Sequence, residues 1–179
     1  MGKIILITGG ARSGKSKFAE ELVKSQGKPQ AYIATAQIFD EEMKQRVALH
    51  KKRRADDWYT VEAPFNAENA IEQCQDFPAI LFDCMTVYTS NIICSYDIEK
   101  LTPAKIQNKI LTAIKKLIEA AKKHIGTTVF VTNEVGSGIV PENKLARQYR
   151  DIAGLCNQYT AQAADKVYFI VSGIPLKIK

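Results

Sequence analysis

Residues 3–16 read KIILITGGARSGKS, and this stretch decides the fold class. Lys3–Thr8 is an isoleucine-rich run with the length and composition of a buried β-strand, and it stops at two glycines. The continuation matches the phosphate-loop pattern G-x-x-x-x-G-K-[ST] at every specified position. It opens the segment Lys15–Ser25, whose apolar residues have helical spacing. A strand, a glycine-rich loop and a helix in this order indicate an α/β protein of the P-loop NTPase class.

The chemistry of the loop requires these residue types. Glycines let backbone N–H groups turn inward around a phosphate, and the N-terminus of a helix adds partial positive charge. Lys15 is expected to reach the β- and γ-phosphates, and the hydroxyl of Ser16 to join the ligands of a Mg²⁺ ion. The residues predicted to bind the triphosphate are Gly9, Gly10, Ala11, Arg12, Ser13, Gly14, Lys15 and Ser16.

The rest of the chain alternates short apolar runs with longer segments of helical periodicity. Strands are predicted at Gln30–Thr35, Trp58–Glu62, Ala79–Asp83, Thr128–Thr132 and Lys166–Val171, and helices at Asp40–Arg54, Pro103–His124 and Asn143–Ala164. Ile174–Ile178 is expected to close a C-terminal hairpin, because Gly173 allows the chain to turn. Strands separated by crossover helices favour a mostly parallel sheet covered on both faces, with ligands at the carboxyl ends of the strands.

Composition limits the class of protein. The chain has 179 residues, with 25 Lys plus Arg against 19 Asp plus Glu and a net charge of +6. Its 46% hydrophobic residues argue against a disordered chain, and its length fits one domain, residues 1–179. The four cysteines form no C-x-x-C pair, and no apolar run has the length of a signal peptide or a membrane span, so a cytoplasmic protein is expected. The positive charge fits either a polyanion-binding surface or a site for phosphorylated molecules.

Two acidic residues follow predicted strands. Asp83 closes an apolar run and is placed to hold Mg²⁺, directly or through water. Its alternative role is to cap the segment Met85–Cys94, since aspartate is favoured at helix N-termini. Glu134 follows another predicted strand, where it could activate water or an acceptor hydroxyl, or serve only in a turn.

His50 lies in a strongly basic segment, RVALHKKRR at residues 46–54. Helical spacing puts Arg46, Arg53 and Arg54 on the same face as the imidazole. A neutral imidazole can attack phosphorus while neighbouring cations stabilise the phosphoryl oxygens, and the same cations lower the pKa of the histidine. The residues alone leave two other interpretations open, a solvated basic helix face and a nucleic-acid contact. His124, at the end of a predicted helix, is interpreted as a polar cap.

Taken together, these segments resemble the bifunctional adenosylcobinamide kinase / adenosylcobinamide-phosphate guanylyltransferase family of cobalamin biosynthesis. The resemblance runs nearly end to end and is most specific in Thr132–Asn143, which reads TNEVGSGIVPEN. Its other parts are Ile5–Ser16, Tyr32–Ala36, the His50 segment with Trp58 and Glu62, Leu81–Thr86, Arg147, Arg150, Asp151, Asn157, Gln158 and Ile174–Lys179. A phosphate loop alone is shared by many proteins, whereas this ordered set is not.

The resemblance implies two reactions. The first phosphorylates adenosylcobinamide with ATP or GTP, and the second transfers GMP from GTP to adenosylcobinamide phosphate through a guanylyl-histidine, for which His50 is at the matching position. It further implies a RecA-like fold and a homotrimer, in addition to the Mg²⁺ site that the sequence itself predicts at Ser16 and Asp83. The nucleotide-binding residues implied beyond the phosphate loop are Ala34, Thr35, Ala36, Lys51, Lys52, Arg53, Arg54, Glu62 and Asp83, while Lys15 and His50 are the implied catalytic residues.

Two functions of other classes stay open beside this one. A nucleic-acid-dependent RecA-like ATPase would also use the phosphate loop and the basic surplus, and it would bind with a steep dependence on salt. A non-catalytic nucleotide switch would bind GTP and turn it over slowly. The cations near the phosphate loop and His50 favour nucleotides over nucleic acid as the partners of the positive charge. The sequence therefore predicts no nucleic-acid partner and no membrane span.

Overall fold

The structure is a computed structural model that describes residues 2–38, 40–54, 58–97 and 100–179, with only the backbone at positions 42, 46 and 50–54. Its centre is one sheet, which has seven strands in the described part of the chain, in the order β3-β2-β4-β5-β1-β6-β7. The strands are β1 (Lys3–Gly9), β2 (Gln30–Ala34), β3 (Trp58–Glu62), β4 (Ala79–Asp83), β5 (Thr127–Val131), β6 (Lys166–Val171) and β7 (Ile174–Lys177). Strands β1 to β6 run parallel, and β7 pairs antiparallel with β6. The predicted α/β class, parallel sheet and C-terminal hairpin are confirmed.

Six helices are found in the described residues: α1 (Lys15–Lys24), α2 (Glu41–Arg54), α3 (Ala67–Gln73), α4 (Met85–Cys94), α5 (Pro103–Lys123) and α6 (Lys144–Ala163). Helix α5 begins where the Thr102 side chain accepts a hydrogen bond from the N–H of Lys105, with Pro103 in the first turn. Helix α6 begins in the same way at Asn143, which accepts from the N–H of Ala146. Helix α3 was not among the predicted elements, because its seven residues are too short to establish a periodic pattern.

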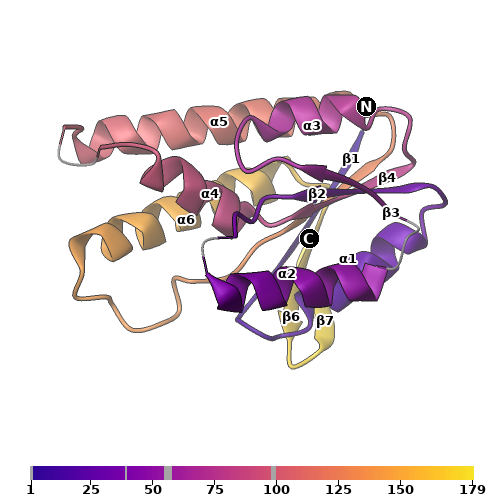
Figure 1. Cartoon of the computed structure of the whole chain (residues 1–179), viewed down its shortest axis with the longest axis horizontal. Coiled ribbons are helices and arrows are strands. Elements are labelled where there is room, and N and C mark those ends of the chain that lie inside the picture. The colour runs from indigo at the N-terminus through magenta and orange to yellow at the C-terminus, as the bar shows by residue number, and fades with distance from the viewer. Residues whose placement is uncertain (1, 39, 55–57, 98–99) are drawn as a thin grey trace.

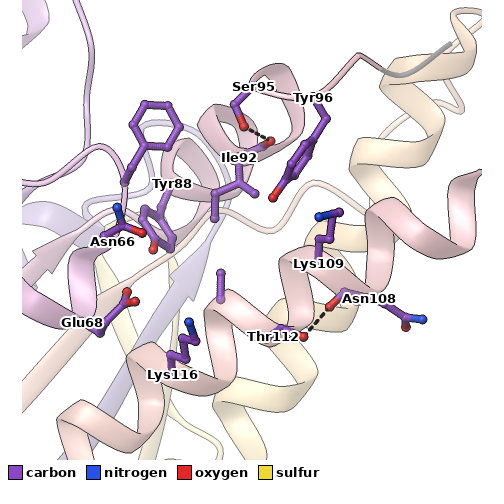
Figure 2. A pocket seen from close by; sticks show the side chains of 12 residues that line it. Asn66, Glu68, Tyr88, Ile92, Ser95, Tyr96, Asn108, Lys109, Thr112 and Lys116 are labelled. Carbon is purple, nitrogen blue, oxygen red and sulfur yellow. Dashed lines mark hydrogen bonds between the residues drawn. The ribbon is translucent and has the colours of Figure 1, made fainter. Parts of the chain in front are cut away.

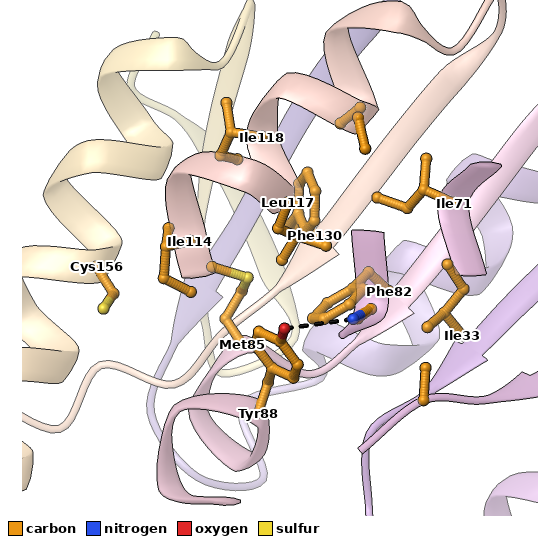
Figure 3. Close-up of a cluster of buried hydrophobic side chains, with 14 of the residues drawn as sticks. Ile33, Ile71, Phe82, Met85, Tyr88, Ile114, Leu117, Ile118, Phe130 and Cys156 are labelled. Carbon is orange, nitrogen blue, oxygen red and sulfur yellow. Dashed lines mark hydrogen bonds between the residues drawn. The ribbon is translucent and has the colours of Figure 1, made fainter. Parts of the chain in front are cut away.

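The two faces of the sheet carry different helices (Figure 1). Helices α3, α4, α5 and α6 cover one face, and α1 packs against the other. On the first face, Leu117 and Ile118 of α5 belong to the same buried cluster as Phe82 and Phe130 of the sheet, whose rings are 5.2 Å apart (Figure 3). Each of these side chains is fully buried, which stabilises the fold by about 1.5–3 kcal/mol per residue.

The register of the sheet brings the carboxyl ends of its strands into one row. Glu62 pairs with Ala34, Ala34 pairs with Asp83, and Asp83 pairs with Val131, which in turn pairs with Ile7, two residues before Gly9. The ends of β3, β2, β4, β5 and β1 therefore lie side by side, as ligand-binding edges of parallel sheets do. No helix among the described residues has the length and apolar character to cross a membrane.

Candidate functional site

The phosphate loop connects β1 to α1 and is held by the turn between β6 and β7. Gly14 adopts the left-handed conformation with φ of 99°, and the N–H of Gly173 donates to the Ser13 carbonyl at 2.8 Å. A Cβ on Gly14 would lie 3.1 Å from Gly173 Cα, and one on Gly9 would lie 2.5 Å from the Ile170 carbonyl oxygen. Both glycines are therefore required by the close approach of the C-terminal hairpin.

Lys15 occupies the interior of this loop. Its side chain is only 6% exposed, and its ammonium donates to the Gly10 carbonyl and, at 3.5 Å, to the Ser13 hydroxyl. Burial lowers the pKa of Lys15, and the charges of Cys84 and Asp83 offset part of that decrease. The ammonium is bound by the neutral oxygens of Gly10 and Ser13, and the charged oxygens of a phosphate can replace them. The resulting hydrogen bond is stronger, because both of its partners are charged.

Asp83 lies at the end of β4, half-buried, and its Oδ2 accepts a hydrogen bond from the Tyr32 hydroxyl at 2.8 Å. The alternative role of Asp83 as a helix cap is wrong, because Cys84 occupies the N-cap position of α4. The charge of Asp83 instead raises the pKa of Lys15 and so offsets part of the effect of burial on that group. Ser16 is half-buried in the first turn of α1.

Thr35 joins the ends of β2 and β4. Its N–H donates to the Asp83 carbonyl at 3.1 Å, and its buried hydroxyl accepts from the N–H of Cys84 at 2.8 Å. The Asn91 side chain donates to the Thr35 carbonyl at 2.8 Å. The side chain of Thr35 thus supports the backbone, while Ala34 and Ala36 are half-buried beside it and Glu62 is exposed at the end of β3.

Helix α2 carries the predicted histidine and its basic neighbours. Its backbone runs from Glu41 to Arg54 between β2 and β3, on the side of the sheet opposite α5 in Figure 1. The side chains of His50, Lys51, Lys52, Arg53 and Arg54, like that of Arg46, lie outside the described residues. Their predicted roles therefore stay predictions.

The segment after β5 lies against the phosphate loop. The N–H of Glu134 donates to the Gly9 carbonyl at 3.0 Å, and its half-buried carboxylate accepts from the N–H of Gly136 at 3.2 Å. Asn133 is fixed by the Thr86 hydroxyl, which accepts from its backbone N–H at 2.9 Å and from its side-chain amide at 3.1 Å. These contacts place an acidic residue beside the first glycine of the loop.

Three contacts that support the site were not predicted from the sequence. Tyr32 binds Asp83, Thr86 binds Asn133, and Gly173, which was predicted only as a turn residue, binds Ser13. Each contact joins residues far apart in the chain, and no local pattern signals it. The order of strands in the sheet was the missing information, since it determines which strand ends are neighbours.

The donor set at this edge fits a magnesium ion. Mg²⁺ prefers oxygen ligands and is usually held by one or two protein groups together with substrate phosphates and water. The carboxylate of Asp83 and the hydroxyl of Ser16 are oxygen donors of that kind. The described residues contain no group of three or more His, Cys, Asp and Glu side chains that could hold a metal by themselves.

Comparison with known proteins identifies relatives over nearly the whole length of the chain. Residues 5–178 match the family model described as "Cobinamide kinase / cobinamide phosphate guanyltransferase". Two proteins called "Bifunctional adenosylcobalamin biosynthesis protein CobU", from Salmonella typhimurium and Escherichia coli, are 45% and 41% identical to this chain, over 98% of it and 99% of their own lengths. "Bifunctional adenosylcobalamin biosynthesis protein CobP" from Pseudomonas aeruginosa is 37% identical over 97% of this chain and 96% of its own.

Proposed function

The chain belongs to the cobinamide kinase / cobinamide phosphate guanylyltransferase family, and from that premise we propose which residues take part in each of the two reactions. It is a bifunctional enzyme of adenosylcobalamin biosynthesis that acts as cobinamide kinase and cobinamide-phosphate guanylyltransferase. The observation that carries the proposal is the buried ammonium of Lys15, enclosed by the phosphate loop and acting electrostatically with Asp83 at the same sheet edge. The family match provides no support for a nucleic-acid-dependent ATPase.

For the kinase step, the aminopropanol hydroxyl of adenosylcobinamide attacks the γ-phosphorus of ATP or GTP. A new oxygen–phosphorus bond forms, the bond to the β-phosphate oxygen breaks, and the hydroxyl proton leaves. Lys15 neutralises charge on the β- and γ-phosphates. Glu134 is the proposed proton acceptor, because it follows β5 and its backbone is bonded to Gly9 of the loop.

For the transfer step, the imidazole of His50 attacks the α-phosphorus of GTP and pyrophosphate leaves. A phosphate oxygen of adenosylcobinamide phosphate then attacks the same phosphorus, which releases His50 and forms adenosyl-GDP-cobinamide. The cations Lys51, Lys52, Arg53 and Arg54 compensate the charge of the nucleotide. Ala34, Thr35, Ala36 and Glu62 contact the nucleotide at the neighbouring strand ends. This proposal is supported by the pairing of Ala34 with Asp83 and Glu62, and Thr35 and Ala36 follow Ala34 directly in the chain.

The remaining features of the proposal concern the whole molecule. Mg²⁺ bound by Ser16 and Asp83 would supply positive charge to the phosphates. The 179 residues form a single catalytic domain, which assembles as a homotrimer in the cytoplasm. The incorporation of N-terminal β1 and C-terminal β6 and β7 into one sheet supports the single domain.

The covalent step is tested with GTP labelled at the α-phosphate. Wild-type protein is expected to retain acid-labile label in the presence of Mg²⁺, and His50→Ala to retain none, because a phosphorus–nitrogen bond is hydrolysed by acid. His124→Gln is the matched control, since His124 is fully buried at the end of α5, and it should label as the wild type does at pH 8. The mechanism is overturned if wild type and His50→Ala label alike, or if neither labels.

A further inference from the structure

A cavity of about 420 Å³ lies between α3, α4 and α5, on the face of the sheet away from α1 (Figure 2). Tyr88 and Ile92 of α4 form one wall, and Asn108, Lys109 and Thr112 of α5 form the opposite wall. The exposed ring of Phe65 lies at its third side, before α3. None of the reactions described above uses these residues.

The polar groups of the cavity restrict what it can bind. Glu68 of α3 and Lys116 of α5 project into it (Figure 2), and Glu68 Oε2 is buried with no hydrogen-bond partner in the described part of the chain. Lys109 has its ammonium 5.1 Å from the centre of the Tyr96 ring. A phosphate would be repelled by the carboxylate, and a cation by the two ammonium groups. A neutral group that both donates and accepts hydrogen bonds can donate to the carboxylate and accept from the ammonium groups.

The wall of the cavity is joined through α4 to the site at the carboxyl ends of the strands. Tyr88 is 1% exposed, its hydroxyl accepts from the N–H of Ala67 at 3.3 Å, and its ring lies 5.7 Å from that of Phe82. The N–H of Tyr88 donates to the Cys84 carbonyl, so one turn of α4 separates the cavity wall from Asp83. A second cavity of about 240 Å³ shares Phe65 and Asn66 with the first and is lined by Glu62.

We propose that this cavity binds peripheral carboxamide groups of the corrinoid acceptor, an inference that rests on the proposed function. Cobinamides carry primary carboxamides around the macrocycle, and each offers N–H donors and a carbonyl acceptor. The amide N–H groups donate to the Glu68 carboxylate, and the amide oxygens accept from Lys109 and Lys116. A volume of about 420 Å³ suits part of the periphery of such a molecule, with Phe65 and Ile92 contacting its apolar atoms.

The test is the KM for adenosylcobinamide in the kinase reaction, measured at saturating ATP. Glu68→Gln and Lys109→Met each remove a charge-assisted hydrogen bond and should raise this KM about tenfold. Thr112→Trp fills the cavity from an exposed position of α5 and should raise it further. The KM for ATP should not change. The matched controls are Glu72→Gln on α3 and Lys105→Met on α5, both exposed and outside the cavity, and they should leave the acceptor KM as it is.

Equilibrium dialysis of adenosylcobinamide without nucleotide separates this inference from the proposed reactions. Weaker binding by Glu68→Gln and Thr112→Trp, with unchanged guanylylation from labelled GTP, supports the cavity as an acceptor subsite. Loss of labelling in the wild type would overturn the histidine mechanism and leave the dialysis result valid. Unchanged acceptor binding and KM in both variants, or equal effects in the controls, would overturn the subsite.

Discussion

Two basic side chains are buried at opposite ends of the parallel strands, which we call the carboxyl edge and the amino edge of the sheet. Lys15 lies at the carboxyl edge, where it is 6% exposed, and His124 lies at the amino edge, where it is fully buried. Burial lowers the pKa of both groups. The surroundings of the two side chains nevertheless differ in the charged groups nearby and in the room that they leave for a ligand.

The carboxyl edge offers charge and space. The charge of Asp83 favours the protonated form of Lys15, and a Cβ on Gly10 would meet no atom within 4 Å. The amino edge is closed, since a Cβ on Gly126 would lie 2.3 Å from the Pro78 carbonyl oxygen. There the His124 Nε2–H donates to the Phe77 carbonyl at 2.9 Å, while Nδ1 has no hydrogen-bond partner among the described residues. Lys15 is thus buried at a site with room for a ligand, whereas His124 is buried where the chain segments pack closely and leave no room for one.

The largest effect is expected from Lys15→Met. Loss of the ammonium should lower the rates of both reactions by about 10²–10³-fold, because each uses a triphosphate bound to the loop. The melting temperature should stay within a few degrees of wild type, since the substitution removes a cation whose burial is unfavourable. Lys17→Met, on the exposed side of α1, is the control. Equal loss of activity in the two variants, or unfolding of Lys15→Met, would contradict the interpretation that Lys15 serves ligand binding and not the stability of the fold.

Much of this contrast was predictable from local sequence. The phosphate-loop pattern located Lys15, and the helix pattern correctly placed His124 at the end of α5. The strands, the long helices and the C-terminal hairpin also followed from periodicity, because each has a repeating apolar pattern or a turn residue at its end. The role proposed for His50 rests mainly on the family resemblance, since a basic helix face by itself has several interpretations.

Contacts between distant segments were not predictable. The bond from Tyr32 to Asp83 joins residues 51 positions apart, and that from Asn133 to Thr86 joins residues 47 apart. Both depend on β4 lying between β2 and β5, an order that no single segment encodes. The cavity beside Glu68 was missed for the same reason, and because α3 is too short for a periodic pattern.

A smaller effect is expected from the pH dependence of stability. The pKa of His124 is lowered in the folded state, so below about pH 6.5 the unfolded chain binds a proton that the native protein does not. Stability should therefore fall as the pH decreases, with a slope of at most about 1.4 kcal/mol per pH unit from this group. His124→Gln should be less stable than wild type at pH 8 and show a shallower decrease down to pH 5. Parallel urea-unfolding curves for the two proteins across this range would contradict the assignment.

The smallest effect is expected from Tyr32→Phe, which removes a single hydrogen bond at the carboxyl edge. The Tyr32 ring packs edge-on against Trp58 with centroids 6.2 Å apart, so phenylalanine should keep the packing. Loss of the 2.8 Å bond to Asp83 should cost about 0.5–1.5 kcal/mol of stability and lower kcat a few-fold, because the carboxylate loses one of its orienting contacts. The effect on kcat should exceed that on the KM for the acceptor, since Tyr32 is not among the residues that line the α3–α5 cavity. A change confined to the acceptor KM would instead assign Tyr32 to acceptor binding and remove the distinction between the two sites.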